Sequence, residues 1–115
     1  MILYGIKNCN TVKNAIDWLN KNKIAFEFHD YKKQGITPAK LNAWSKQVGW
    51  ESLVNKRGTT WRQLDDAEQN KITNEKAAIA LMMEKNSVIK RPLIEEGDKV
   101  LLLGFDEEEY SNKLR

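Results

Sequence analysis

The first 31 residues show two patterns of apolar and polar positions. Met1–Ile6 is a continuous apolar run, MILYGI, which is typical of a buried strand. After a polar turn, with Asn10 or Thr11 placed to cap a helix, apolar residues recur at helical spacing: Val12, Ala15, Ile16 and Leu19. Ala25–Tyr31 then alternates, with Glu27 and His29 on its polar face. The pattern predicts a βαβ unit with parallel strands and a right-handed crossover.

The middle of the chain predicts helices. Thr37 precedes Pro38 at a helix start, and one apolar face continues to Gly49. A short helix is expected at Trp50–Val54 and a loop at Asn55–Thr60. Two more helices are expected, with Asp66 and Thr73 as their N-caps. The last helix is expected to bury its apolar residues and to end near Asn86; these residues are Ile79, Met82 and Met83. We expect residues 37–86 to form an inserted helical subdomain.

Two short apolar runs close the sequence. Leu93-Ile94 and Val100–Leu103 flank the turn Glu95–Asp98, which predicts an antiparallel hairpin. Asp106–Leu114 has the acidic first turn that a helix dipole favours. The whole order predicts one α/β domain over residues 1–115, with a four-stranded mixed sheet built from a βαβ half and a ββα half.

Composition and charge limit the classes of binding partner that we expect. The length of 115 residues suits one domain with a real core. The net charge of +3 is uneven: residues 1–63 carry 11 basic and 4 acidic side chains, and residues 64–115 carry 8 and 12. The basic residues form no tract and are mostly lysine, so we expect no nucleic-acid partner. A basic face instead favours small anionic substrates.

The chain contains one cysteine and one histidine, Cys9 and His29. It cannot form an internal disulfide, and we expect no metal site because the usual ligands are too few. The apolar runs are shorter than the roughly 18 residues that span a bilayer, and the N-terminus lacks signal-peptide features. We therefore expect a cytoplasmic protein with no membrane partner. No heptad or exposed apolar stripe demands a dimer, so we expect a monomer.

Cys9 is the main candidate for chemistry. It lies where the first strand passes into a helix, and amide groups and the positive end of the dipole stabilise a thiolate there. Lys7 and Lys13 act in the same direction. The alternative is a buried, inert thiol, but every immediate neighbour of Cys9 is polar. Position 12, where a second thiol would give the two-cysteine redox motif, is Val12. An external thiol must then complete any redox cycle, and glutathione is the obvious intracellular one.

Arg91 and Pro92 open the third predicted strand. Proline is confined to the first position or to special geometries in a strand, so Pro92 marks a rigid strand start and a candidate cis bond. The alternative is an ordinary turn proline beside a surface arginine. Ligand sites of small α/β sheets lie outside the carboxyl ends of parallel strands. Whether Arg91 reaches Cys9 depends on the strand order, which these patterns leave open.

Four segments, in this order and spacing, resemble the arsenate reductase-like (ArsC/Spx) family: YGIKNCNTVKNAIDWL, LVNKRGTTWRQL, SVIKRPL and LLLGFDEEEY. The resemblance covers nearly the whole chain and is closest to the YffB-type branch. It implies a thioredoxin-like fold with an inserted helical subdomain. By position, Cys9 matches the family's nucleophile, Arg91 matches a pocket arginine, and Pro92 matches the cis-proline opposite the cysteine.

The resemblance also indicates which activities to expect. Arsenate reductases place two further arginines around the oxyanion. The corresponding positions in this chain are Asn55 and a position near Gly104, and neither is an arginine. Because each charge-assisted hydrogen bond contributes about 1.5–3 kcal/mol, their loss disfavours arsenate as the substrate. The regulators of the Spx type often carry the two-cysteine motif, which Val12 removes.

The expected function is that of a glutathione-dependent thiol oxidoreductase. Cys9 would be the nucleophile, and Asn8, Asn10 and Thr11 would offer donors around its sulfur. Arg91, and also Arg57, would hold a glutathione carboxylate or another anion. Glutathione would be a co-substrate, with no bound cofactor. The alternatives are an arsenate reductase and a non-enzymatic Spx-like regulator; the latter would be favoured if three tryptophans were exposed together, namely Trp44, Trp50 and Trp61.

Overall fold

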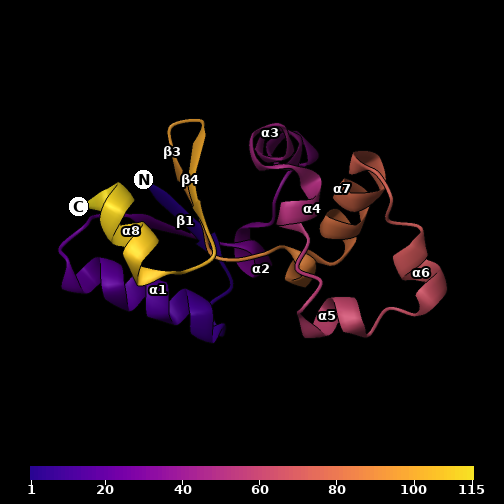
Figure 1. Ribbon diagram of the computed structural model, residues 1–115, viewed down its shortest axis with the longest axis horizontal. Coiled ribbons are helices and arrows are strands. Elements are labelled where there is room, and N and C mark those ends of the chain that lie inside the picture. The colour runs from indigo at the N-terminus through magenta and orange to yellow at the C-terminus, as the bar shows by residue number, and fades with distance from the viewer. The chain divides into compact units, whose positions relative to one another are not determined.

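The computed structural model describes all 115 residues, which form two compact units. The first unit comprises Met1–Gln34 and Arg91–Arg115, and the second comprises Gly35–Lys90. The first contains the strands β1 (Ile2–Gly5), β2 (Glu27–Asp30), β3 (Leu93–Glu96) and β4 (Lys99–Leu103), and the helices α1 (Asn10–Lys21), α2 (Tyr31–Gln34) and α8 (Glu107–Leu114) (Figure 1). The expected inserted segment, 37–86, falls inside the second unit.

The four strands form one mixed sheet in the order β2-β1-β3-β4. β1 pairs in parallel with β2, and Gly5 lies opposite Asp30. β3 is antiparallel to both β1 and β4. Its pairing with β4 has a register shift between Ile94 and Glu95. The βαβ and ββα halves therefore share one sheet, which confirms the predicted α/β fold of the thioredoxin-like type.

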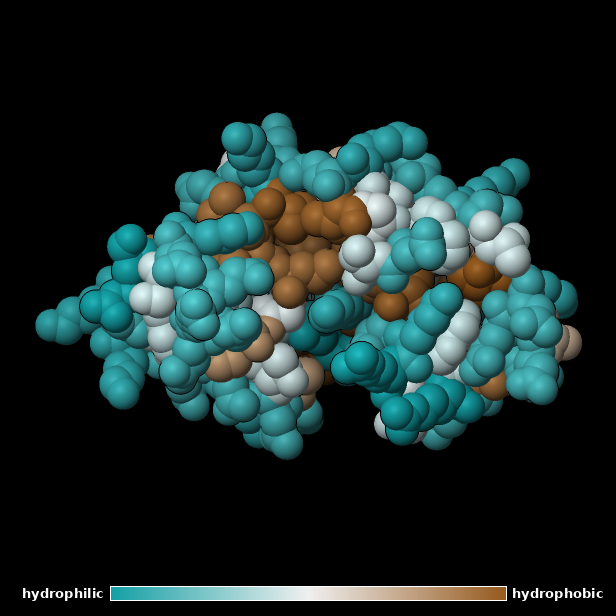
Figure 2. Space-filling view, in the orientation of Figure 1, coloured by the Kyte–Doolittle hydropathy of each residue, from teal (hydrophilic) through white to brown (hydrophobic).

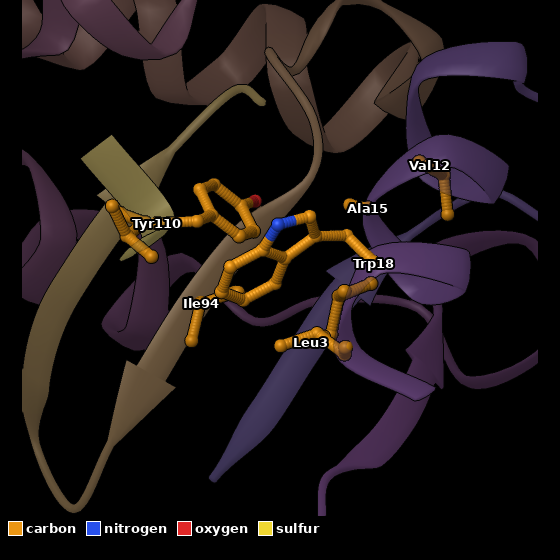
Figure 3. Packing of buried hydrophobic residues seen from close by; sticks show 8 residues of the cluster. Leu3, Val12, Ala15, Trp18, Ile94 and Tyr110 are labelled. Atoms are coloured by element: carbon orange, nitrogen blue, oxygen red, sulfur yellow. The ribbon is translucent and has the colours of Figure 1, made fainter. Parts of the chain in front are cut away.

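The core of the first unit lies on one face of this sheet, beneath α1 and α8. Its buried cluster is drawn in Figure 3 and comprises Leu3, Val12, Ala15, Trp18, Leu19, Ile94, Leu102 and Tyr110. The rings of Trp18 and Tyr110 meet edge to face at 5.6 Å, and the Tyr110 hydroxyl donates to the Gly104 carbonyl oxygen at 2.7 Å. The outer surfaces of the two helices are mainly hydrophilic (Figure 2). The apolar spacing of α1 therefore has the predicted role of covering the sheet.

The second unit is helical. It contains α3 (Pro38–Val48), α4 (Trp50–Leu53), α5 (Thr59–Arg62), α6 (Asp66–Asn70), α7 (Glu75–Glu84) and a 3₁₀ turn (Asn86–Val88). Thr37 caps α3 as predicted, with its hydroxyl oxygen accepting from the Lys40 N–H at 3.1 Å. A backbone bridge between Val54 and Ile89 joins the segment after α4 to the end of the helical region.

Several local predictions in this unit were wrong by a residue or a turn. The caps of α6 and α7 are Asp65 and Asn74, not Asp66 and Thr73, because it is these side chains that accept from the N–H groups three residues ahead. The predicted loop also ends early, since Thr59 starts the short helix α5. Met82 is buried as predicted, but Met83 is 39% exposed, and α7 buries Ala78 and Leu81 beside Met82.

Two observations concern the Spx-like alternative and a membrane-spanning protein. Trp44 and Trp61 are buried and pack inside the protein, so the three tryptophans do not form an exposed cluster. None of the helices has the length and apolar character needed to cross a lipid bilayer.

Candidate functional site

Cys9 occupies the N-cap position of α1. Its carbonyl oxygen accepts from the Lys13 N–H at 2.9 Å, and its side chain forms no capping hydrogen bond. The sequence had placed the cap at Asn10 or Thr11; the helix begins one residue earlier because Cys9 already has the extended backbone of a cap residue. The thiol is half-buried and packs against the core cluster. It therefore lies at the end of α1 where unpaired amide groups point outward.

The electrostatic setting of Cys9 favours an anion. α1 has 12 residues, so its dipole is well developed, and its first turn contains no acidic residue. Lys7 precedes the thiol by two residues and Lys13 follows it by four. The dipole, the amides and both lysines therefore place positive charge near Cys9.

A close contact fixes where α1 begins. A Cβ on Gly5 would lie 2.8 Å from one Val12 methyl carbon and 3.1 Å from the other. The glycine at the end of β1 thus lets the first turn of α1 approach the sheet more closely than any other residue would. Since Cys9 lies between Gly5 and Val12, this contact also sets the position of the thiol.

The three polar residues next to Cys9 in the sequence were predicted to offer donors to its sulfur. Asn8, Asn10 and Thr11 are exposed, and their side chains form no hydrogen bond within the protein. They are therefore free to donate to a ligand on the sulfur.

Arg91 and Pro92 lie at the same edge of the sheet as the Cys9 loop. Leu93 pairs with Tyr4, and because β3 runs antiparallel to β1, the residues before Leu93 lie beside the end of β1. The Arg91-Pro92 peptide bond is cis, and the Pro92 carbonyl accepts from the Gly104 N–H at 2.7 Å. The strand order that the sequence patterns left open therefore brings Arg91, Pro92 and Cys9 to one edge.

Arg57 belongs to the other compact unit. It is exposed and lies in the loop before α5, where its backbone N–H donates to the Asn55 side-chain oxygen at 3.2 Å. Its place in an anion pocket with Cys9 stays a prediction.

A polar cluster on the second face of the sheet was not foreseen. The Tyr4 hydroxyl donates to Glu95 at 2.9 Å, and the His29 ring lies 4.7 Å from that of Tyr4. Glu95, which the sequence placed in a turn, belongs to β3 and is 2% exposed. Burial, then the hydrogen bond to Glu95, raises the pKa of Tyr4 above its ordinary value. His29 is thus part of an aromatic stack rather than an exposed strand residue.

Tyr31 continues this cluster toward Arg91. Its ring stacks on Tyr4 at 6.1 Å and is 1% exposed. Burial raises the pKa of its phenol above the ordinary value, and the charge of Arg91 acts in the opposite direction. The hydroxyl of Tyr31 therefore stays neutral within the field of the Arg91 guanidinium. No alternation rule would have found this cluster, because its members come from β1, β2, α2 and β3.

The structure shows no group of three or more His, Cys, Asp or Glu side chains that could hold a metal ion. The thiol of Cys9 can itself take part in thiol chemistry.

Comparisons with known proteins agree with this geometry. The ArsC family model matches residues 4–112. An uncharacterized protein of Haemophilus influenzae is 44% identical over 94% of this chain and 93% of its own length. Among solved structures, the YFFB (PA3664) protein superposes with a TM-score of 0.91 at 43% identity, covering 99% of this chain and 98% of the other. An arsenate reductase (ArsC) related protein from Brucella melitensis superposes with a TM-score of 0.79 at 39% identity, over 96% and 91%. The chain therefore belongs to the ArsC family.

Proposed function

We propose that this protein is a glutathione-dependent thiol reductase in which Cys9 is the only nucleophile. The observation that carries the proposal is a lone, half-buried thiol at the N-terminus of a 12-residue helix, in a chain that contains no second cysteine. Reactive cysteines commonly lie at helix N-termini, and the absence of a resolving thiol makes a small external thiol necessary. Membership of the ArsC family and similarity to an arsenate reductase (ArsC) related protein support thiol-based reduction.

The reaction consists of two thiol–disulfide exchanges. In the first, the Cys9 thiolate attacks the glutathione sulfur of a mixed disulfide R–S–S–G. The bond between the two substrate sulfurs breaks, a bond between Cys9 and glutathione forms, and R leaves as a thiolate that takes up a proton. In the second, the thiolate of a free glutathione attacks the glutathione sulfur on Cys9. The Cys9 thiolate is released together with glutathione disulfide, so the mixed disulfide of the substrate is reduced to a thiol and glutathione is oxidised.

The residues around Cys9 have roles consistent with this cycle. Asn8, Asn10 and Thr11 offer exposed donors beside the sulfur. Arg91, at the same edge of the sheet, supplies a guanidinium for an anionic group of the substrate, and we propose Arg57 as a second cation in this role.

Arsenate is a less suitable substrate than a disulfide. Gly104, near which the family resemblance places a further arginine, has a φ of +87°, where an L side chain is strained. Asn55, at the other such position, uses its side-chain oxygen to accept from the Arg57 N–H. Of the three arginines that the family resemblance places around an oxyanion, only the one at Arg91 is therefore present.

Turnover of a glutathionylated peptide tests the proposal. Glutathione, glutathione reductase and NADPH are supplied, and NADPH oxidation is followed in the presence of wild-type protein or Cys9→Ser. We expect catalysis that depends on Cys9 and a much lower rate when arsenate and a glutaredoxin replace the peptide. Equal rates for wild type and Cys9→Ser, or arsenate turnover at the rate of a dedicated reductase, would refute the assignment.

A further inference from the structure

A cavity next to the Cys9 loop belongs to none of the features described above. It has a volume of about 450 Å³ and lies between α1, β2 and α2. Its lining residues are Lys7, Ile16, Phe28, Asp30, Lys33 and Gln34. Cavities of this volume are common among small-molecule sites.

The chain's topology explains why these residues meet. Phe28 and Asp30 are two residues apart on β2 and so point to the same face of the sheet, the face that α1 covers. Ile16 follows Cys9 by seven residues, which places it on the same side of α1 and about 10 Å further along the helix axis. Lys7 stands at the other end of the cavity, two residues before Cys9. The cavity therefore extends along the side of α1 on which the thiol lies.

The polar groups of the cavity are available to a ligand. Lys7 and Lys33 are exposed and form no ion pair or hydrogen bond within the protein. The Gln34 side-chain oxygen accepts from the Asp30 N–H at 3.1 Å, which leaves its amide nitrogen as a donor. Two cations and one amide donor suit carboxylates.

One anionic group lines the cavity as well. Asp30 is 6% exposed, and one of its carboxylate oxygens accepts from the Lys32 N–H at 2.9 Å. The second oxygen is available for a cationic N–H of a ligand. Ile16 and Phe28 complete the lining with an apolar wall that suits methylene groups.

We infer that this cavity binds the body of glutathione and so presents its sulfur to Cys9. The inference rests on the proposed function. The lining carries two positive charges and one negative charge, and glutathione carries two carboxylates and one ammonium, so the two sets of charges are complementary. A tripeptide spans about 10 Å when extended, which matches the length of helix between Cys9 and Ile16. In this arrangement Lys7 and Lys33 bind the carboxylates, and Asp30 binds the ammonium.

Binding of S-methylglutathione, which has no reactive sulfur, tests the cavity separately from the redox chemistry. The variant Lys7→Gln/Lys33→Gln removes both cations. Its control, Lys21→Gln/Lys32→Gln, removes the same amount of charge from residues of α1 and α2 that lie outside the cavity. We expect the first variant to bind about tenfold more weakly, equivalent to about 1.4 kcal/mol, and the control to change the Kd less than twofold. Equal weakening by both variants, or no binding by the wild type, would overturn the inference.

A third variant tests the role of Asp30. Asp30→Asn keeps the oxygen that accepts from the Lys32 N–H but removes the negative charge. The wild type is expected to prefer S-methylglutathione over its N-acetylated form severalfold, and the variant to lose this preference. An unchanged preference would contradict the assignment of Asp30 to the ammonium.

Reaction rates distinguish this inference from the proposed function. Cys9 of each variant is treated with glutathione disulfide and with the uncharged 2-hydroxyethyl disulfide. The inference predicts that Lys7→Gln/Lys33→Gln slows only the reaction with glutathione disulfide beyond the control. If both reactions slow equally, the lysines act on the thiolate and not on the ligand, which refutes the cavity. If the wild type binds S-methylglutathione but reacts with neither disulfide, the proposed function fails while the cavity assignment stands.

Discussion

The contact between Gly5 and Val12 gives a sharp prediction about how α1 is held against the sheet. Gly5→Ala adds a Cβ that would lie 2.8 Å from a Val12 methyl carbon, closer than such carbons approach in proteins. Gly5 is not among the residues with positive φ, so alanine meets no backbone obstacle there. The whole effect should therefore come from the steric conflict with Val12.

The magnitude follows from two opposing effects. Overpacking of this kind costs about 1–3 kcal/mol, and the loss of glycine flexibility in the unfolded chain returns about 0.4–1 kcal/mol. We expect Gly5→Ala to lower the free energy of unfolding by about 1–2 kcal/mol. Val12→Ala removes two methyl groups from a fully buried side chain and should cost about 2–3 kcal/mol. In the double variant the added methyl group occupies space that Val12 vacates, so the combined cost should be at least about 1 kcal/mol below the sum.

Urea unfolding followed by tryptophan fluorescence measures these values, because Trp18 belongs to the same core cluster. The control pair is Gly97→Ala with Val12→Ala: Gly97 has a φ of +61° and open space around it, so its cost is one of backbone strain and should add to that of Val12→Ala. Additivity within about 0.5 kcal/mol for the Gly5 and Val12 pair would refute the steric explanation.

Two predictions concern pH. All three tyrosines, Tyr4, Tyr31 and Tyr110, have a pKa raised above 10 by burial, so their stabilising effect is complete below about pH 10 and is lost as the pH rises through the folded values. Tyrosinate absorbance at 295 nm should therefore appear only with loss of the far-ultraviolet circular dichroism; ionisation without unfolding would contradict this. The Ser45 hydroxyl, which donates to Glu75 at 2.6 Å, and then Lys46, lower the pKa of Glu75. Ser45→Ala should reduce stability at neutral pH, and this difference should shrink as the pH falls through the folded pKa of Glu75; a constant difference from pH 7 to pH 3 would contradict this.

The sequence predicted the elements whose signals are local. The run Met1–Ile6 and the helical spacing after Cys9 are complete within a few residues, and both led to the observed strand and helix. The exact N-cap residue is harder to predict than the helix itself, because neighbouring polar residues compete for the cap position. Asp65 and Asp66 are chemically identical, and only the backbone geometry selects the first.

Features that join distant parts of the chain could not be predicted from local patterns. Lys7 and Lys33 line one cavity only because β1 and β2 pair in parallel in one particular register. Tyr4 meets Glu95 only because β3 inserts beside β1 in the sheet. The sequence suggested Arg91 as a partner of Cys9 through family resemblance, and the strand order places both at the same end of the sheet.

The central claim is that Cys9 alone carries the chemistry and accepts glutathione. The most direct measurement is the intact mass of the protein after incubation with glutathione disulfide, followed by peptide mapping and by treatment with reduced glutathione. The account predicts one glutathione per chain, on Cys9, which reduced glutathione removes again, and no adduct on Cys9→Ser. A wild-type protein that stays unmodified, or an adduct on Cys9 that reduced glutathione cannot remove, would contradict it.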